Sequence, residues 1–113
     1  MQESILTSIK KLLGIAEDYT HFDADIIMHI NTVFMILMQL GVGPTSGFSI
    51  SDDSDVWGDF LTSDQQLESV KTYIYLRVKM MFDPPTSGTV IQSTENLIKE
   101  LEFRLNVEVD PEM

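Results

Sequence analysis

Hydrophobic residues recur at helical spacing in four stretches of the chain. The first stretch, residues 4–13, carries a hydrophobic face and ends before Gly14, a residue type that commonly terminates helices. The second stretch begins near Asp23, a favourable N-cap residue with Thr20 as the alternative, and runs to Leu40, before Gly41, Gly43 and Pro44. The pattern therefore predicts a short amphipathic helix followed by a longer one.

The second predicted helix is apolar on most of its circumference. Its polar side chains form one narrow stripe, and a helix with so little polar surface must be covered on most sides. The helix is therefore either the centre of a bundle or a contact with a second subunit. Asn31 falls on the apolar side, where its amide either fixes the register between helices or binds a loop. The stripe consists of Asp25, His29, Thr32 and Gln39.

Residues 42–62 lack helical periodicity. They contain three glycines, Pro44 and four aspartates, a composition typical of loops. Residues 48–50 alternate as a short strand would, and residues 56–57 could pair with them across an acidic turn. The segment is expected to form a long loop or a small β-hairpin.

The third predicted helix begins at Ser63, with Gln66 completing a capping box, and ends at Phe82 before Asp83 and two prolines. Its expected inner face comprises Leu67, Val70, Ile74, Val78 and Met81.

The fourth predicted helix runs from residue 87 or 88 to Leu105. The polar, acidic residues 106–113 are expected to form a flexible tail. The expected core positions of the helix are Val90, Ile91, Thr94, Leu97, Ile98, Leu101 and Leu105.

These elements predict a mainly α fold. We expect a small bundle of about four helices, with the loop or hairpin between the second and third helices. The length of 113 residues suits one domain covering residues 1–113. The hydrophobic fraction of 43% is ordinary for a globular protein, so a disordered chain is not expected.

Charge is distributed unevenly along the chain. The net charge is −11, and residues 12–70 hold ten acids without a lysine or arginine. Such a surface repels a phosphate backbone, so DNA binding through a basic patch is disfavoured. Solubility alone also explains the acidity.

Membrane and secretory segments are not expected. The longest apolar run, residues 33–38, is far shorter than the roughly 20 residues of a membrane-spanning helix. Lys10 and Lys11 follow the first apolar stretch, the reverse of the order in a secretory signal. The absence of cysteine excludes disulfides and thiolate chemistry, and a cytoplasmic protein is expected.

Candidate metal, phosphate and catalytic motifs are weak. Asp25 and His29 share a helix face, and His21 and Asp23 lie nearby, but a full ligand set is missing. Residues 53–64 depart from a calcium loop at the fifth and twelfth positions. The glycines of residues 41–47 follow a helix instead of opening one, as a phosphate loop would. The sequence predicts no cofactor, no metal and no enzymatic activity.

Protein contacts are better supported. The candidate interface residues are Trp57, Phe60, Met28, Met35 and Met38. Aromatic side chains anchor many interfaces and methionine adapts to different partners, although packing within the core explains both residue types as well.

An ordered set of short stretches resembles the head–tail connector proteins of tailed phages and prophages. The resemblance extends from about residue 9 to residue 105. The stretches are IKKLLGI (9–15), DYTHFD (18–23), IIMHINTVF (26–34), QLGVGP (39–44), WGDF (57–60), VKTYIYLRVK (70–79) and FDPP (82–85).

The resemblance implies a structural protein without catalytic residues or cofactors. Members of that family form a homo-oligomeric ring beneath the portal protein, extend the DNA channel and present the surface on which the next neck or tail protein docks. The protein would be in the host cytoplasm during assembly and then in the virion neck. The isolated chain could be a monomer. DNA would pass through without specific binding.

Two further expectations concern the acidic residues. If the chain forms such a ring, Asp52, Asp53, Asp55 and Asp59 are candidates to line the channel or its rim. The alternative function is a small acidic binding protein, such as a DNA-mimicking inhibitor or regulator of a host enzyme.

Overall fold

The computed structural model describes residues 1–109. In this range it contains five helices and no strand. The mainly α prediction is confirmed. The helices are α1 (Ile5–Leu13), α2 (Asp23–Gln39), α3 (Trp57–Phe60), α4 (Leu67–Phe82) and α5 (Gly88–Val109).

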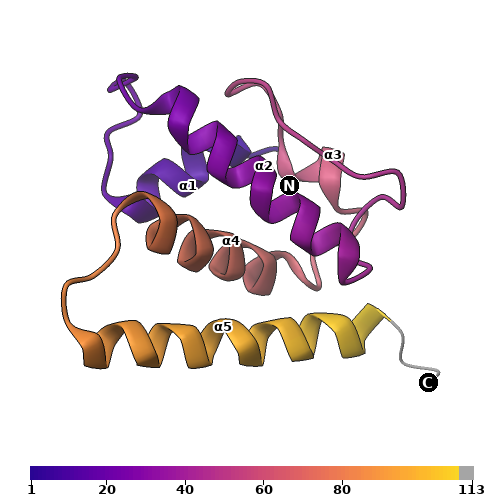
Figure 1. The fold of residues 1–113 in the computed structure, drawn as a ribbon. Helices are drawn as coiled ribbons and strands as arrows, with labels where there is room; N and C mark the ends of the chain where they lie inside the picture. Colours follow the sequence, from indigo (N-terminus) through magenta and orange to yellow (C-terminus); the bar gives the residue numbers. More distant parts are fainter. Residues whose placement is uncertain (110–113) are drawn as a thin grey trace.

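Three helices form the body of the molecule, and α5 lies along one side of it (Figure 1). Helix α2 packs against α1 and α4, and α4 also packs against α5. The hydrophobic core lies between these helices and includes residues from all five. None of the helices within residues 1–109 is long and apolar enough to cross a bilayer.

Helix α1 is capped at both ends, and its predicted end before Gly14 is confirmed. The Ser4 hydroxyl accepts a hydrogen bond from the Thr7 amide at 3.2 Å. Gly14 follows the helix with a φ of 82°, a left-handed conformation that glycine adopts without strain. Ile5 and Ile9 are fully buried, so the hydrophobic face of this short helix is covered.

Helix α2 begins one residue earlier than predicted. Phe22 occupies the N-cap position, and Asp23 is the first helical residue instead of the cap. The Asp23 carboxylate is directed to Lys10, with Oδ1 2.8 Å from Nζ, and so does not cap the helix. Asp23 therefore joins α2 to α1.

The predicted β-hairpin is wrong. Val56 forms an isolated antiparallel bridge with Ser4, and Trp57 begins the single turn of α3. Instead, the Asn31 side chain forms hydrogen bonds with both the backbone amide and the backbone carbonyl of Ile50. The N-terminal segment and Asn31 thus provide the hydrogen-bond partners that a hairpin would have provided.

Helix α4 begins at Leu67 and not at Ser63, so the predicted capping box does not start this helix. Residues 64–66 form a turn in which the Asp64 carbonyl accepts a hydrogen bond from the Leu67 amide at 3.2 Å. The predicted end at Phe82 is confirmed.

The expected flexible tail is partly helical. Helix α5 continues to Val109, so the prediction is wrong for residues 106–109, and residues 110–113 lie outside the described residues. Leu105 is fully buried, and the Asn106 side-chain amide donates to the Leu40 carbonyl at 3.2 Å. These contacts hold the end of α5 against the end of α2.

Three predicted core residues lie at the surface. Met81 of α4 is 40% exposed, and Val90 and Leu97 of α5 are 48% and 42% exposed. Helix α5 packs mainly on α4, so one flank of its hydrophobic face stays uncovered. Among its described side chains, Ile98 and Leu105 are buried.

Candidate assembly surfaces

The outer side of α2 carries exposed methionines. Met28 is 58% exposed, Met35 62% and Met38 39%. Opposite them, Ile26, Ile30, Val33, Phe34 and Leu37 form the buried side of the helix. We call the three exposed methionines the methionine face. Exposed hydrophobic side chains grouped on one helix face are typical of surfaces that bind other proteins.

A shallow groove of about 500 Å³ runs beside the methionine face. Met28, Met35 and Asn31 line it from α2, and Phe48 and Ser49 line it from the following loop. Most of this lining is apolar, and its side chains have the adaptable shape that methionine provides. The groove enlarges the surface that a partner helix could contact.

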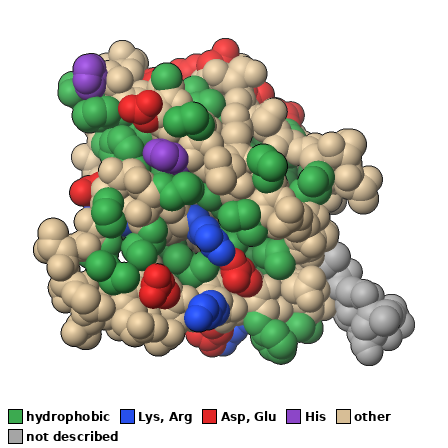
Figure 2. All heavy atoms as spheres, viewed as in Figure 1, with side chains coloured by type: hydrophobic (Ala, Val, Ile, Leu, Met, Phe, Trp, Pro, Cys, Tyr) green, Lys and Arg blue, Asp and Glu red, His purple; other side chains and the backbone are tan. Residues whose placement is uncertain are grey.

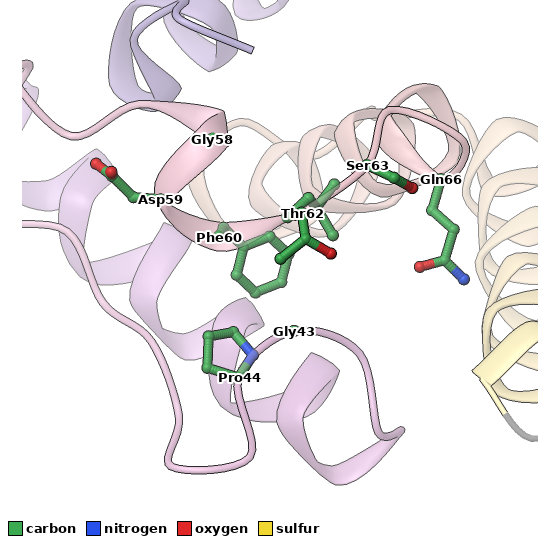
Figure 3. A pocket seen from close by; sticks show the side chains of 9 residues that line it. Gly43, Pro44, Gly58, Asp59, Phe60, Thr62, Ser63 and Gln66 are labelled. Carbon is green, nitrogen blue, oxygen red and sulfur yellow. The ribbon is translucent and has the colours of Figure 1, made fainter.

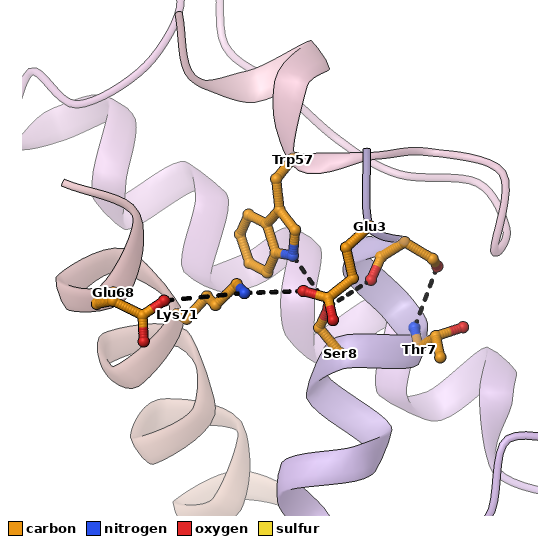
Figure 4. Close-up of polar contacts among 7 residues, drawn as sticks. Glu3, Thr7, Ser8, Trp57, Glu68 and Lys71 are labelled. Carbon is orange, nitrogen blue, oxygen red and sulfur yellow. Dashed lines mark hydrogen bonds and ion pairs between the residues drawn. The ribbon is translucent and has the colours of Figure 1, made fainter. Parts of the chain in front are cut away.

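Trp57 and Phe60 lie inside the protein. Trp57 is fully buried and Phe60 is 4% exposed, so both pack in the core of the described chain. The Trp57 indole donates to the Ser8 hydroxyl at 3.0 Å, and the Ser8 hydroxyl donates to the Ser4 carbonyl at 2.6 Å (Figure 4). Of the residues proposed as interface anchors, the three methionines are exposed, whereas the two aromatic side chains hold α3 in place.

Lys71 connects α4 to this tryptophan site. Its ammonium group lies 5.7 Å from the centre of the Trp57 ring and 2.8 Å from a Glu3 carboxylate oxygen (Figure 4). The hydrogen bond from Lys71 is the largest of the contacts that lower the pKa of Glu3. The N-terminal segment is therefore fixed to α4 as well as to α3.

Residues 50–59, which we call the acidic loop, run from the end of the segment after α2 into α3. The loop is ordered by its own aspartates. The Asp55 carboxylate accepts a hydrogen bond from the Ser51 amide at 2.7 Å, and the Asp59 carboxylate accepts one from Val56 at 3.2 Å. Asp52 accepts hydrogen bonds from the Ser54 hydroxyl and amide, which lower the pKa of this carboxyl group. Aspartate suits such turns because its side chain replaces a backbone acceptor.

The same aspartates contribute negative charge to the surface. Asp52, Asp53 and Asp59 are exposed, and Asp55 is half-buried. The structure therefore groups all four predicted channel residues in one loop and its adjoining helix turn. A surface of this kind repels nucleic acid.

Asn31 binds a loop, one of the two roles that its position predicts. Its side-chain oxygen accepts a hydrogen bond from the Ile50 amide at 2.8 Å, and its side-chain nitrogen donates to the Ile50 carbonyl at 3.0 Å. Ile50 is 3% exposed, so its backbone groups need these partners. Asn31 thereby fixes the acidic loop to the base of the methionine face.

A second hollow lies between the end of α2 and α3 (Figure 3). It has a volume of about 400 Å³ and is lined by Gly43, Pro44, Asp59 and Phe60 among others. Gly43 has a φ of 86°, and a Cβ atom built there would lie 2.2 Å from the Phe60 ring. The glycines after α2 end the helix, as the helix-stop interpretation predicts, and Gly43 also gives space to Phe60.

A polar cluster joins α4 to α5. The Tyr73 hydroxyl donates to Glu102 at 2.7 Å, Arg77 donates to the Tyr73 oxygen at 3.1 Å, and Arg77 forms an ion pair with Glu102. Burial and the nearby Glu102 raise the pKa of Tyr73. Partial burial raises the pKa of Glu102, but the hydrogen bonds from Tyr73 and Arg77 outweigh it and the pKa lies below its usual value.

Sequence reasoning missed this cluster. Tyr73 and Arg77 are four residues apart on one helix face, which is a usable signal. Their partner lies 25 residues beyond Arg77, and nothing local in the sequence identifies it. The space-filling view shows basic side chains next to acidic ones on this side of the molecule, among many hydrophobic side chains (Figure 2).

The candidate metal residues have other contacts. Asp23 pairs with Lys10, while the rings of His21 and His29 pack near Phe22 and Phe82. Within residues 1–109, no three histidine, aspartate or glutamate side chains are grouped so as to hold a metal ion. These contacts give the histidines a packing role beside an aromatic cluster.

Comparison with known proteins assigns a family to this arrangement of helices. No curated protein and no solved structure matches the chain. The sequence model of one family, described as phage connector protein, matches residues 5–112. The match includes every helix and both the methionine face and the acidic loop. The chain belongs to the phage connector protein family.

Proposed function

We propose that the protein is a structural subunit of a head–tail connector ring, which docks beneath the portal protein, extends the DNA channel and presents the surface for tail attachment. The observation that carries this proposal is the family match over residues 5–112. The exposed methionine face supports it, because a subunit of an assembly needs uncovered surface for its neighbours. No catalytic step is part of this function.

The proposed partners are the portal protein, a neighbouring neck or tail protein, and other copies of the chain. The protein would assemble in the host cytoplasm and then reside in the virion neck. Met28, Met35 and Met38 would contact partners directly. Trp57 and Phe60 would act from inside the subunit, because they hold α3 and the adjoining loop in position.

The acidic loop would face the channel or its rim. The carboxylates of Asp52, Asp53, Asp55 and Asp59 would keep the wall from binding the phosphate backbone, so that DNA passes without being held. The hydrogen bonds within the loop would keep these charges at fixed positions.

Affinity purification from phage-producing cells tests the proposed role. The tag belongs at the C-terminus, because the Met1 carbonyl accepts a hydrogen bond from the Gly58 amide at 2.7 Å and an N-terminal tag would disturb this contact. Mass spectrometry should identify the portal protein together with a neck or tail protein. An untagged culture provides the control. Recovery of a host nuclease or polymerase without any virion protein would contradict the proposal and support the inhibitor alternative.

The channel assignment has a separate test. Asp53→Asn and Asp59→Asn should be compared with Glu95→Asn, an exposed acid on α5. Each loop variant should leave particle assembly intact and slow DNA release from purified particles, whereas the α5 variant should not. Equal release rates in all three variants would place the loop outside the channel.

A further inference from the structure

The methionine face belongs to a regular seam on α2. Starting from Ala24, the outward positions follow one another at intervals of four, three, four and three residues. This average spacing of 3.5 residues is the pattern of a helix face that packs along a second helix. The seam, which we call the α2 seam, comprises Ala24, Met28, Asn31, Met35 and Met38.

Helix α5 carries a second seam with the same spacing. It starts from Val90 and ends at Arg104, so it also covers 15 residues. Val90 and Leu97 are 48% and 42% exposed, and the Arg104 side chain is 66% exposed. This α5 seam comprises Val90, Thr94, Leu97, Leu101 and Arg104.

Neither seam is fully covered within the subunit. The side of α2 that packs on α1 and α4 is opposite the methionines, and α5 packs mainly on α4. Figure 1 shows that α2 and α5 lie on different sides of α4. A subunit with two different uncovered faces of equal length can join copies head to tail, the arrangement that closes into rings.

Charge sets the direction in which the two seams match. The start of α2 carries Asp25 beside its seam, whereas the far end of α2 has no charged residue. On α5 the order is reversed, because Arg104, which also pairs with Glu100 at 2.8 Å, ends the seam and residues 88–94 carry no charge. Antiparallel packing therefore brings Arg104 towards Asp25 and leaves the uncharged ends, Met38 and Val90, together.

We infer that the α2 seam of one copy packs antiparallel on the α5 seam of a second copy. This inference rests on the proposed ring and specifies which faces join its subunits. It matches Met38 with Val90, Met35 with Thr94 and Met28 with Leu101.

Cysteine cross-linking between separate copies tests the pairing. The chain contains no cysteine, so each introduced thiol is unique. Met38→Cys protein is mixed with Val90→Cys protein to test the antiparallel pairing. A second mixture, with Arg104→Cys protein, tests the opposite direction. A third, with Asn96→Cys protein, is the control at an exposed site on the same helix. All four sites are exposed, so the substitutions leave the core unchanged.

Oxidation should give a severalfold excess of the Met38→Cys/Val90→Cys disulfide dimer over both other mixtures. The reaction is performed with purified protein at high concentration, and also in particles from cells in which the two variants replace the original protein. A Met38→Cys dimer with itself, preferred linkage to Arg104→Cys, or equal yields in all three mixtures would overturn the inference. Linkage of Met38→Cys to a cysteine placed in the portal or neck protein instead would overturn it as well.

Charge reversal gives an independent test of direction. Arg104→Glu should weaken self-association severalfold in sedimentation experiments, and combining it with Asp25→Arg should restore it. Failure of the second substitution to restore association would contradict the antiparallel pairing.

These outcomes can be separated from those of the proposed function. If the protein co-purifies with the portal but the predicted disulfide does not form, the pairing fails and the connector role stands. If the disulfide forms but the protein is absent from particles, the connector role fails and the head-to-tail contact stands.

Discussion

A buried lysine determines how α1 joins α2. Lys10 is 2% exposed, and its ammonium group donates to the carbonyls of Glu17 and Tyr19 at 3.0 and 2.8 Å. Its third contact is the Asp23 carboxylate at 2.8 Å. The ammonium group thus has two carbonyl acceptors and an ion-pair partner, and a buried charge is tolerated when it is paired in this way.

Replacing this lysine should destabilise the protein. Lys10→Met leaves the Asp23 carboxylate without its ion-pair partner and removes both loop contacts, so the free energy of unfolding should fall by about 3 kcal/mol. Lys11→Met, an exposed neighbour, should change it by less than about 0.5 kcal/mol. Urea denaturation measures both variants. Equal losses would show that Lys10 acts only through its favourable position near the end of α1.

Three glycines allow backbone strain to be separated from lack of space. Gly43→Ala places an alanine in the left-handed backbone conformation, with its Cβ against the Phe60 ring. We therefore expect the free energy of unfolding to fall by about 3 kcal/mol. Gly14 also has a positive φ but has open space around it, so Gly14→Ala should lower the free energy of unfolding by only about 1 kcal/mol. Gly88→Ala should be nearly neutral. Thermal unfolding tests the order, and a Gly43→Ala variant as stable as Gly14→Ala would contradict the close contact.

Asn31 joins the backbone of the loop residue Ile50 to helix α2. Asn31→Ala leaves the buried backbone groups of Ile50 without partners and should cost about 2 kcal/mol. Hydrogen exchange should show faster exchange of the Ile50 amide, while Thr32→Ala, whose hydroxyl bonds within its own helix, should not change it. An unchanged Ile50 amide in Asn31→Ala would mean that the loop is held by other contacts.

At the scale of the elements, the polar cluster between α4 and α5 makes their packing depend on pH. The pKa of Glu102 lies below its usual value of 4.5, so the folded state binds a proton less readily than the unfolded state does. The cluster therefore contributes its full stabilisation above pH 4.5 and loses it as the pH falls through the lower, folded-state value.

Glu102→Gln should remove part of this acid sensitivity. At pH 7 the variant should lose about 1–2 kcal/mol, since the Arg77 pair is partly exposed and partly screened. Between pH 5 and pH 3, about the interval over which carboxylates titrate, its stability should fall less steeply than that of the original protein. Glu100→Gln, in an exposed pair with Arg104, provides the control. Parallel curves for the original protein and Glu102→Gln would contradict the assignment.

The sequence predicted most helices because their stability depends on local patterns. Periodic hydrophobic residues located α1, α2 and α4, and Gly14 and Asp83 marked the ends of α1 and α4. The α3 turn was missed because Val56 pairs with the N-terminal segment, a contact over about 50 residues that no local pattern reveals. The end of α5 was also misplaced, since Leu105 and Asn106 are fixed by distant residues.

The surfaces were predicted less completely than the fold. Exposed methionines on α2 follow from its excess of apolar residues, because one helix cannot bury its whole circumference in a small bundle. Trp57 could equally have been core or interface from sequence, and its burial depends on Ser8, 49 residues away. The roles of Lys10 and Glu102 depend on tertiary partners and had no local signal.

At the scale of the whole molecule, the features have one consistent interpretation. The helical body carries an apolar seam on α2, another on α5, and an acidic loop between α2 and α3. Assembly would cover the seams and leave the acidic loop exposed to the channel. The connector role thus assigns a use to each of these three surfaces.

Imaging of purified particles is the most direct test of this role. A gold label or a fused fluorescent domain at the C-terminus should locate the protein at the capsid vertex, and averaged electron microscopy of the neck should show a ring between the portal and the tail. Helical subunits of this fold should fit the ring density. Particles that lack the protein, or a label on the capsid shell or tail tip, would contradict the connector role.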